Sequence, residues 1–384
     1  MSTRAPGGLI ARRQLLLLTA LAASGAPHAG WALPAKALQF PRDFGSHPEL
    51  RTEWWYITGH GQTAAGRAFG FQVTFFRSRV DATQAMRSAF QVTFFRSRVD
   101  ATQAMRSAFA AKQLVFAHAA VTDLEGRVLR HDQRIARAGF DVASASETDT
   151  DVRLRDWSLV RDAGSGAYTA RIPAGEFTLD LRFAPSQPVL LQGREGLSRK
   201  GPDPEQASYY YSEPQLQAQG RLTLQGQAPF EITGTAWLDH EWSEALMHPE
   251  AVGWDWIGMN LDDGSALTAF HLRRRDGSAL WSGGSFRPRG GAARIFGPGE
   301  VRFDALRSWT SPRTRTSYPT HWRIDTPAGR FEVQALLDDQ ELDSRGSTGG
   351  VYWEGLSELR DAQQGKRVGR GYLEMTGYAA PLRL

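Results

Sequence analysis

The stretch WWYITGHGQTAAGRAFGFQVTF at residues 54–75 decides the fold. It contains two short runs of aromatic and β-branched residues, 54–58 and 69–75, separated by glycines and polar residues. Two such runs with a glycine-rich turn between them predict a pair of antiparallel strands. Similar runs recur at 170–183, 216–224 and 230–237, and helical periodicity is scarce. We therefore predict an all-β protein built from sandwich or barrel sheets.

A faint internal repeat indicates two related domains. The residues WWYI at 54–57 and AFGF at 68–71 resemble WDWI at 254–257 and LTAF at 267–270, with a turn between the two parts in each case. A chain of 384 residues is longer than one ordinary domain. We expect a leader, one domain over 38–243 and a second domain over 244–384.

A second repeat is literal, because residues 71–89 and 90–108 are identical. The two copies compete for one strand position, and an added strand would reverse every later strand of an antiparallel sheet. We expect one copy to pair in the sheet and the other to form a loop. Deletion of residues 90–108 should then leave fold and function intact.

The first 32 residues have the features of an export signal. Arg12 and Arg13 precede an apolar run at 15–23 that is too short to span a bilayer, and small residues surround a cleavage site after Ala32. The paired arginines favour twin-arginine export, and an ordinary secretory signal is the alternative. We expect a periplasmic or otherwise extracytoplasmic protein without an integral membrane segment.

Composition narrows the classes of function. The chain has no cysteine, which excludes disulfides, thiolate metal sites and cysteine nucleophiles. The formal net charge is +4, and removal of the three arginines of the leader leaves +1, with no basic stripe for nucleic acid. The histidines lack metal-ligand spacing, and no nucleophile elbow is present. We expect no metal, no cofactor and no nucleic-acid partner.

The first segment with candidate chemistry surrounds Glu53. On a strand, Glu53 and Trp55 share one face, and Trp54 and Tyr56 share the other. An acid in an apolar, aromatic pocket has a raised pKa and can donate a proton. Glu53 is therefore a candidate catalytic residue, and Trp54 and Tyr56 are candidate ligand contacts. The alternative is a core strand whose acid pairs with an arginine or a backbone group.

The second segment surrounds His240. His240 and Trp242 share one strand face, and Trp254, Asp255 and Trp256 follow with both indoles on one face and the carboxylate on the other. Histidine and carboxylate groups can transfer protons, and indole faces can stabilise a developing carbocation. His240 and Asp255 are candidate catalytic residues, and the three tryptophans are candidate ligand contacts. The alternative is a buried histidine with a structural hydrogen bond.

The third segment, residues 193–212, joins a glycine-rich basic loop to the aromatic run SYYYS. Tyr210 in this run is a further candidate ligand contact. The alternative is a solvated loop followed by a core strand.

These segments together resemble the secreted branch of the carotenoid hydratase family, which is also called AttH-like or predicted secreted hydrolase. The resemblance is carried by TEWWY at 52–56, GLSRKG at 196–201, YYYS at 209–212, WLDHEW at 237–242, GWDW at 253–256, YWEG at 352–355 and GRGYLEMTGY at 369–378. It implies a fold of two lipocalin-like antiparallel β-barrels packed together.

The resemblance also implies a range of functions. Carotenoid hydratases add water to a terminal double bond without a redox cofactor, and their His-x-Trp pattern matches His240 and Trp242. The family's tyrosine and aspartate on the following strand correspond to a stretch with Phe270 and His271 but no acid, so Asp255 is the candidate replacement. Fungal relatives act as pericyclic cyclases, and AttH-like members are often encoded beside transporter components.

Three functions follow from the residues and the resemblance. We expect first a protein that binds an apolar small molecule, a lipid or isoprenoid, and serves an ABC transporter or an envelope pathway. The second is a cofactor-independent hydratase or isomerase that uses acid–base chemistry in an aromatic pocket. The third is a secreted hydrolase, although the sequence shows no nucleophile–base pair for it.

Overall fold

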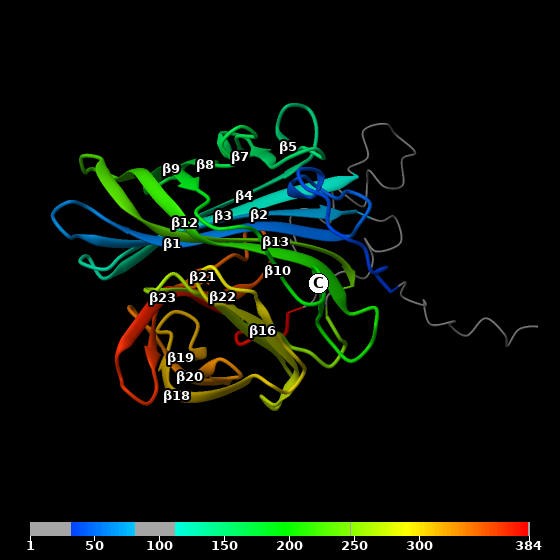
Figure 1. Ribbon diagram of the computed structural model, residues 1–384. Coiled ribbons are helices and arrows are strands. Elements are labelled where there is room, and N and C mark those ends of the chain that lie inside the picture. The colour runs from blue at the N-terminus through cyan, green and yellow to red at the C-terminus, as the bar shows by residue number, and fades with distance from the viewer. Residues whose placement is uncertain (1–31, 81–111, 246, 383–384) are drawn as a thin grey trace, which may run out of the picture. The chain divides into compact units, whose positions relative to one another are not determined.

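A computed structural model describes residues 32–80, 112–245 and 247–382. These residues form two curled antiparallel β-sheets, preceded by a short 3-10 helix, η1 (Arg42–Phe44) (Figure 1). The predicted fold of two lipocalin-like barrels is confirmed. Within these ranges, no helix has the length and apolar character needed to cross a membrane. Residues 1–31, nearly all of the predicted leader, lie outside the described residues.

The first sheet contains the strands that Figure 1 colours from blue to green. Their bounds are β1 (Thr52–Gln62), β2 (Ala68–Arg79), β3 (Gln113–Asp123), β4 (Val128–Arg137), β5 (Ala143–Ala145), β6 (Asp151–Leu154), β7 (Trp157–Arg161), β8 (Tyr168–Pro173), β9 (Phe177–Ala184), β10 (Leu190–Leu191), β11 (Leu197–Arg199), β12 (Ala207–Leu224) and β13 (Phe230–Ala245). The order is β4-β3-β2-β1-β13-β12-β9-β8-β7-β6-β5, and β10 and β11 pair with β12. The first strand therefore lies between the second strand and the last.

The second sheet repeats this arrangement. Its strands are β14 (Gly253–Leu261), β15 (Ala266–Arg273), β16 (Ala279–Arg287), β17 (Arg294–Phe296), β18 (Arg302–Thr310), β19 (Ser317–Thr326), β20 (Gly329–Ala335), β21 (Glu341–Asp343), β22 (Val351–Asp361) and β23 (Arg367–Met375). The order is β17-β16-β15-β14-β23-β22-β20-β19-β18, and β21 pairs with β22. Strand β14 lies between β15 and β23, just as β1 lies between β2 and β13. The faint sequence repeat falls on these two equivalent strands.

The literal repeat supplies one strand of the first sheet. Residues 71–79 of the first copy belong to β2, which pairs with β1 on one side and β3 on the other. The second copy, residues 90–108, lies outside the described residues.

Strand alternation divides the side chains of β1 between two apolar clusters. Trp55 and Ile57 belong to the core inside the first barrel, whereas Trp54 and Tyr56 belong to a cluster that also contains residues of the second sheet. The second barrel has a core of its own, to which Ile257 of β14 contributes. Both faces of the central strands are therefore covered.

Hydrogen bonds join the two sheets around this shared cluster. The Gln215 side chain donates to the carbonyls of Leu261 and Ser265 at 3.0 and 2.9 Å. In the other direction, the Asn260 side chain donates to the carbonyl of Ala236 at 3.0 Å. These buried bonds fix how the barrels pack and so define the space between them.

A candidate site between the barrels

A cavity of about 530 Å³ lies between the two sheets. Its walls come from strands β1, β2, β3, β12 and β13 of the first sheet and from β14, β15, β22 and β23 of the second. The lining is rich in aromatic side chains, namely Trp54, Tyr56, Phe76, Phe116, Tyr210, Tyr352, Trp254, Trp256 and Phe270. A volume of this size, with aromatic walls and polar groups that converge on the space, is typical of small-molecule sites.

The faint repeat builds both walls of this cavity. Side chains of a strand alternate between faces, so Trp54 and Tyr56 leave β1 on the same side. The equivalent positions on β14 are Trp254 and Trp256, which approach from the second sheet. The rings of Tyr56 and Trp256 meet edge to face, with centroids 5.4 Å apart.

Asp239 on β13 is a buried acid that lines the cavity. Its Oδ1 accepts hydrogen bonds from Ser212 at 2.5 Å and from the Trp237 indole at 2.7 Å, and its Oδ2 accepts one from the Tyr210 hydroxyl at 2.7 Å. Burial raises the pKa of Asp239 to about 7, against the opposing effect of the three donors. Both protonation states are therefore populated near neutral pH.

Glu354 and Glu374 form a second group of acids in the cavity lining. They are direct cross-strand partners on β22 and β23; Glu354 is buried and Glu374 is half-buried. Burial and the charge of Glu374 raise the pKa of Glu354 well above its usual range, and burial raises the pKa of Glu374 to about 7. Like charges on facing residues repel, so the pair retains a proton at neutral pH.

Lys200 brings an ammonium group to the cavity. Its Nζ lies 3.0 Å from a carboxylate oxygen of Glu241 and 4.5 Å from the ring centres of both Tyr210 and Phe270. The ammonium is thus held by one carboxylate and two aromatic faces.

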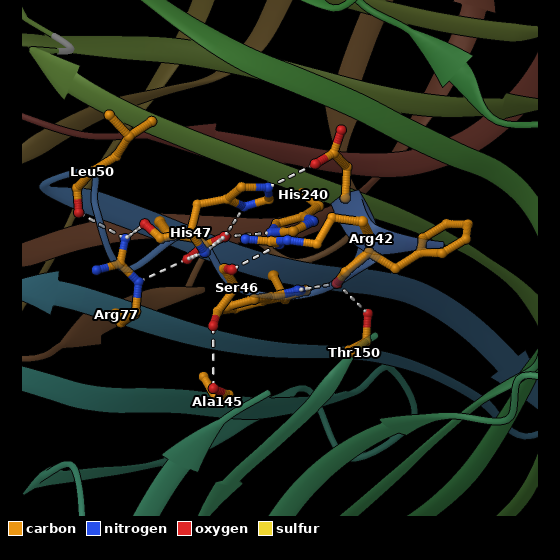
Figure 2. A network of polar contacts seen from close by, with 12 residues as sticks. Arg42, Ser46, His47, Leu50, Arg77, Ala145, Thr150 and His240 are labelled. Atoms are coloured by element: carbon orange, nitrogen blue, oxygen red, sulfur yellow. Dashed lines mark hydrogen bonds and ion pairs between the residues drawn. The ribbon is translucent and has the colours of Figure 1, made fainter. Parts of the chain in front are cut away.

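His240 and Glu53 meet inside the first barrel, on the faces of β13 and β1 that point away from the shared cluster. Figure 2 shows His240, His47 and Arg77 in this network of polar contacts. His240 Nε2 donates to Glu53 Oε1 at 2.9 Å, and His240 Nδ1 accepts from the Tyr211 hydroxyl at 3.1 Å. His47 Nδ1 also donates to Glu53 Oε1, at 2.8 Å, and Arg77 Nε donates to Glu53 Oε2 at 2.7 Å. Both oxygens of Glu53 therefore have donors.

The protonation states of this network follow from its contacts. Burial alone would raise the pKa of Glu53, but hydrogen bonds from His240 and His47 and the charge of Arg77 hold that pKa far below its usual range. Burial lowers the pKa of His240 to about 4, so this ring is neutral at pH 7. The His47 ring behaves differently, because hydrogen bonds to Asp43 and Glu53 overcome burial and raise its pKa.

The same three residues are close enough to hold a metal ion, because ligand atoms of His47, Glu53 and His240 lie within 4.8 Å of one another. However, Glu53 already binds the guanidinium of Arg77, and a metal cation would have to displace these donors and would be repelled by that charge. We therefore assign the group as a buried charge network rather than a metal site.

Asp255 and Trp242 also lie away from the cavity lining. Asp255, inside the second barrel, accepts from His271 at 2.5 Å and forms an ion pair with Arg273 at 2.7 Å. Trp242, inside the first barrel, stacks on the ring of His47 with centroids 3.9 Å apart.

The structure thus brings together only part of the predicted site. The predicted ligand contacts that line the cavity are Trp54, Tyr56, Tyr210, Trp254 and Trp256. Among the predicted catalytic residues, Glu53 borders the cavity, whereas His240 and Asp255 do not. The catalytic roles of all three stay predictions.

Sequence reasoning did not select the acids of the second sheet or Lys200. The signal for the acids is an ionisable residue within an apolar run: Glu354 follows Trp353, and Glu374 lies between Leu373 and Met375. Such an acid is buried on a strand that has both faces covered, and burial is what shifts its pKa.

Comparison with known proteins identifies the family. The AttH-like family model matches residues 31–89 and 81–378, two ranges that overlap inside the repeated block. The chain belongs to the AttH-like family. A crystal structure of an AttH from Nitrosomonas europaea shares 46% sequence identity with this AttH-like chain and has a TM-score of 0.79, over 90% of this chain and 99% of that one. The predicted resemblance is confirmed.

More distant structures share the AttH-like fold. Kievitone hydratase from Nectria haematococca is 14% identical with a TM-score of 0.65, over 90% of this chain and 94% of that one. CghA is 14% identical with a TM-score of 0.51, over 87% and 89% of the two chains. At this level of identity the likeness shows the fold alone. None of the curated proteins compared with the chain matches it.

Proposed function

We propose that this AttH-like protein binds an apolar or amphipathic small molecule, such as a lipid or isoprenoid, in the cavity between its barrels. The observation that carries the proposal is the set of aromatic side chains that both sheets contribute to one cavity. Aromatic rings provide large apolar contact areas, and a few buried polar groups orient the ligand.

Titration with a neutral fluorescent apolar probe, N-phenyl-1-naphthylamine, tests this proposal. The probe should bind, and Trp254→Ala should weaken its affinity by about tenfold, because an aromatic contact contributes roughly 1–1.5 kcal/mol. The control is Trp309→Ala, which removes another half-buried indole that lies outside the cavity lining. Absence of binding, or equal losses in both variants, would contradict the proposal.

A second candidate function is hydration or isomerisation of an isoprenoid double bond, and the acids in the cavity favour it. A protonated Asp239 could donate its proton to an alkene carbon, which leaves a carbocation that the neighbouring indoles stabilise. Water would then add to the cation and return a proton to the carboxylate. Hydration requires a product one water heavier, and isomerisation requires a rearranged product of unchanged mass. Asp239→Asn should reduce the rate of either reaction by about a hundredfold or more.

We also propose that the protein is exported and passes its ligand to or from transporter components. The support for export is the leader sequence, in which Arg12 and Arg13 precede a short apolar run. The proposed link to transporter components rests on the family resemblance alone. The mass of the exported protein should correspond to a chain that begins at Leu33. An intact N-terminus on all of the protein would contradict export by a cleaved signal.

A further inference from the structure

We propose that the ligand carries a protonated amine, and that Glu354 and Glu374 bind this ammonium group at the second-sheet wall of the cavity. This inference rests on the proposed binding function and names the chemistry of the ligand's polar end. An apolar or aromatic body would occupy the remainder of the cavity.

The first support is a pair of carboxyl groups without a cation. Among the described residues, neither Glu354 nor Glu374 forms an ion pair, although the two lie side by side on β22 and β23. A buried charge needs a partner or must be neutralised by a proton. An ammonium group in the cavity would supply that partner for both carboxylates.

The second support is an incomplete set of hydrogen bonds. Trp254 Nε1 donates to Glu374 Oε2 at 3.1 Å. The Tyr56 hydroxyl and the Gln72 side chain interact with Glu354, but in the described part of the chain Glu354 Oε1 and the Tyr56 hydroxyl lack a hydrogen bond of normal geometry. Both groups are more than nine-tenths buried and line the cavity. An ammonium group has several N–H donors and no acceptor, so it complements carboxylate and hydroxyl oxygens.

The third support is the aromatic surroundings of the pair. The indoles of Trp254 and Trp256 and the ring of Tyr56 lie in the same lining as the two acids. Indole and phenol faces attract cations, and this attraction is larger in a site that excludes water.

Lys200 provides a precedent inside the same cavity. Its ammonium group is held by the carboxylate of Glu241 and the rings of Tyr210 and Phe270. The Glu354–Glu374 pair offers the same combination of carboxylate and aromatic groups without an ammonium group of the protein. The ligand would complete this second arrangement.

The charges around Glu354 and Glu374 also disfavour a ligand whose polar end is an anion. The titratable groups that bear on the pair are Tyr56 on β1, Asp239 and Glu241 on β13, Asp255 on β14, Tyr352 on β22 and Tyr372 on β23. None of these groups is a cation, and the two cations of the described cavity lining, Lys200 and Arg77, are already paired with Glu241 and Glu53. A ligand carboxylate or phosphate placed beside the pair would therefore lack a cationic partner.

Binding should release protons. Because burial raises the pKa of both glutamates, the free pair holds protons near pH 7, and an ammonium group favours their loss. The affinity for an alkylamine, whose own pKa is near that of lysine, about 10.4, should therefore increase from pH 6 to pH 8.

The experiment compares three probes with the same decyl chain: decylammonium, decanol and decanoate. Each is titrated against the complex of the full mature protein with N-phenyl-1-naphthylamine, at pH 7 and below micelle-forming concentrations. Decylammonium should displace the probe at least about tenfold better than decanol, and decanoate should be the weakest. Calorimetry in two buffers of different ionisation enthalpy should show proton release for decylammonium alone.

Glu354→Gln and Glu374→Gln should abolish the preference for decylammonium while they keep the affinity for decanol. The matched control is Glu213→Gln, which replaces another buried acid with a raised pKa outside the cavity lining, and which should keep the preference. Decanol or decanoate binding as tightly as decylammonium would overturn the ammonium assignment but leave the proposed function intact. Failure of all three probes and of the naphthylamine to bind would overturn both.

Discussion

At the scale of the residue, Glu53 shows how a buried charge can be structural even in a segment dense in ionisable groups. Its two oxygens accept from His47, His240 and Arg77, and Arg77 also donates to the backbone carbonyls of His47 and Leu50 (Figure 2). The network fixes the segment before β1 against the strands of the first barrel. Removing one partner leaves the other charge buried and unpaired.

We therefore expect Arg77→Met to lower the free energy of unfolding by about 3–5 kcal/mol, measured by denaturant titration at pH 7. The control is Arg221→Met, because Arg221 forms an exposed ion pair with Glu231 and should change stability by less than about 1 kcal/mol. Equal effects of the two substitutions would show that the buried network does not stabilise the barrel.

Replacement of the buried acid Glu213, unlike replacement of Arg77, is expected to increase the stability of the folded protein at neutral pH. Burial raises its pKa to about 7 even though it accepts a hydrogen bond from Tyr168. The protonated form is favoured in the folded state, so its stabilising contribution is complete below pH 4.5 and is lost as the pH rises through 7. Glu213→Gln, which has no proton to lose, should gain up to about 3 kcal/mol over the wild type between pH 5 and pH 8. A difference in stability that is constant with pH would contradict this.

At the scale of the element, strand alternation was the part of the site that could be predicted from sequence. The spacing correctly separates Trp54 and Tyr56 from Glu53, and His240 from Asp239. It does not indicate which face meets the cavity, because both faces of β1 and β13 are buried and the usual contrast between apolar and polar faces is absent.

The residues of the cavity were harder to predict than the fold, because they come from distant parts of the sequence. The strand runs and glycine turns identify an all-β chain locally, whereas the cavity joins strands from both halves of the sequence. Glu374 is not placed beside Asp239 by any spacing, since their proximity depends on how the two barrels pack. The sequence also does not distinguish a buried acid with a shifted pKa from an exposed acid, because the shift depends on the three-dimensional surroundings.

The repeated block supplies a prediction at this scale. The first copy forms β2, and residues 80–89 and 109–112 would still connect β2 to β3 after residues 90–108 are deleted. The entropy of closing a connection between two strands changes only slowly with its length, so the deletion should shift the melting temperature by only a few degrees. A collapse of the melting temperature would show that the second copy is structural.

At the scale of the whole molecule, the two barrels have separate cores but share the candidate site. Each sheet curls around its own apolar residues, and the cavity lies where the outer faces of the two barrels meet. Neither barrel alone has both aromatic walls or the full set of acids. Function in this protein is therefore expected to depend on the packing between barrels rather than on the interior of either one.

The most direct test of this account is a crystal structure of the mature protein with N-phenyl-1-naphthylamine bound. We predict density for the probe between Trp54 and Tyr56 of the first sheet and Trp254 and Trp256 of the second. Density for the probe inside one barrel, or on an outer surface away from these four side chains, would contradict the claim that the cavity between the barrels is the binding site.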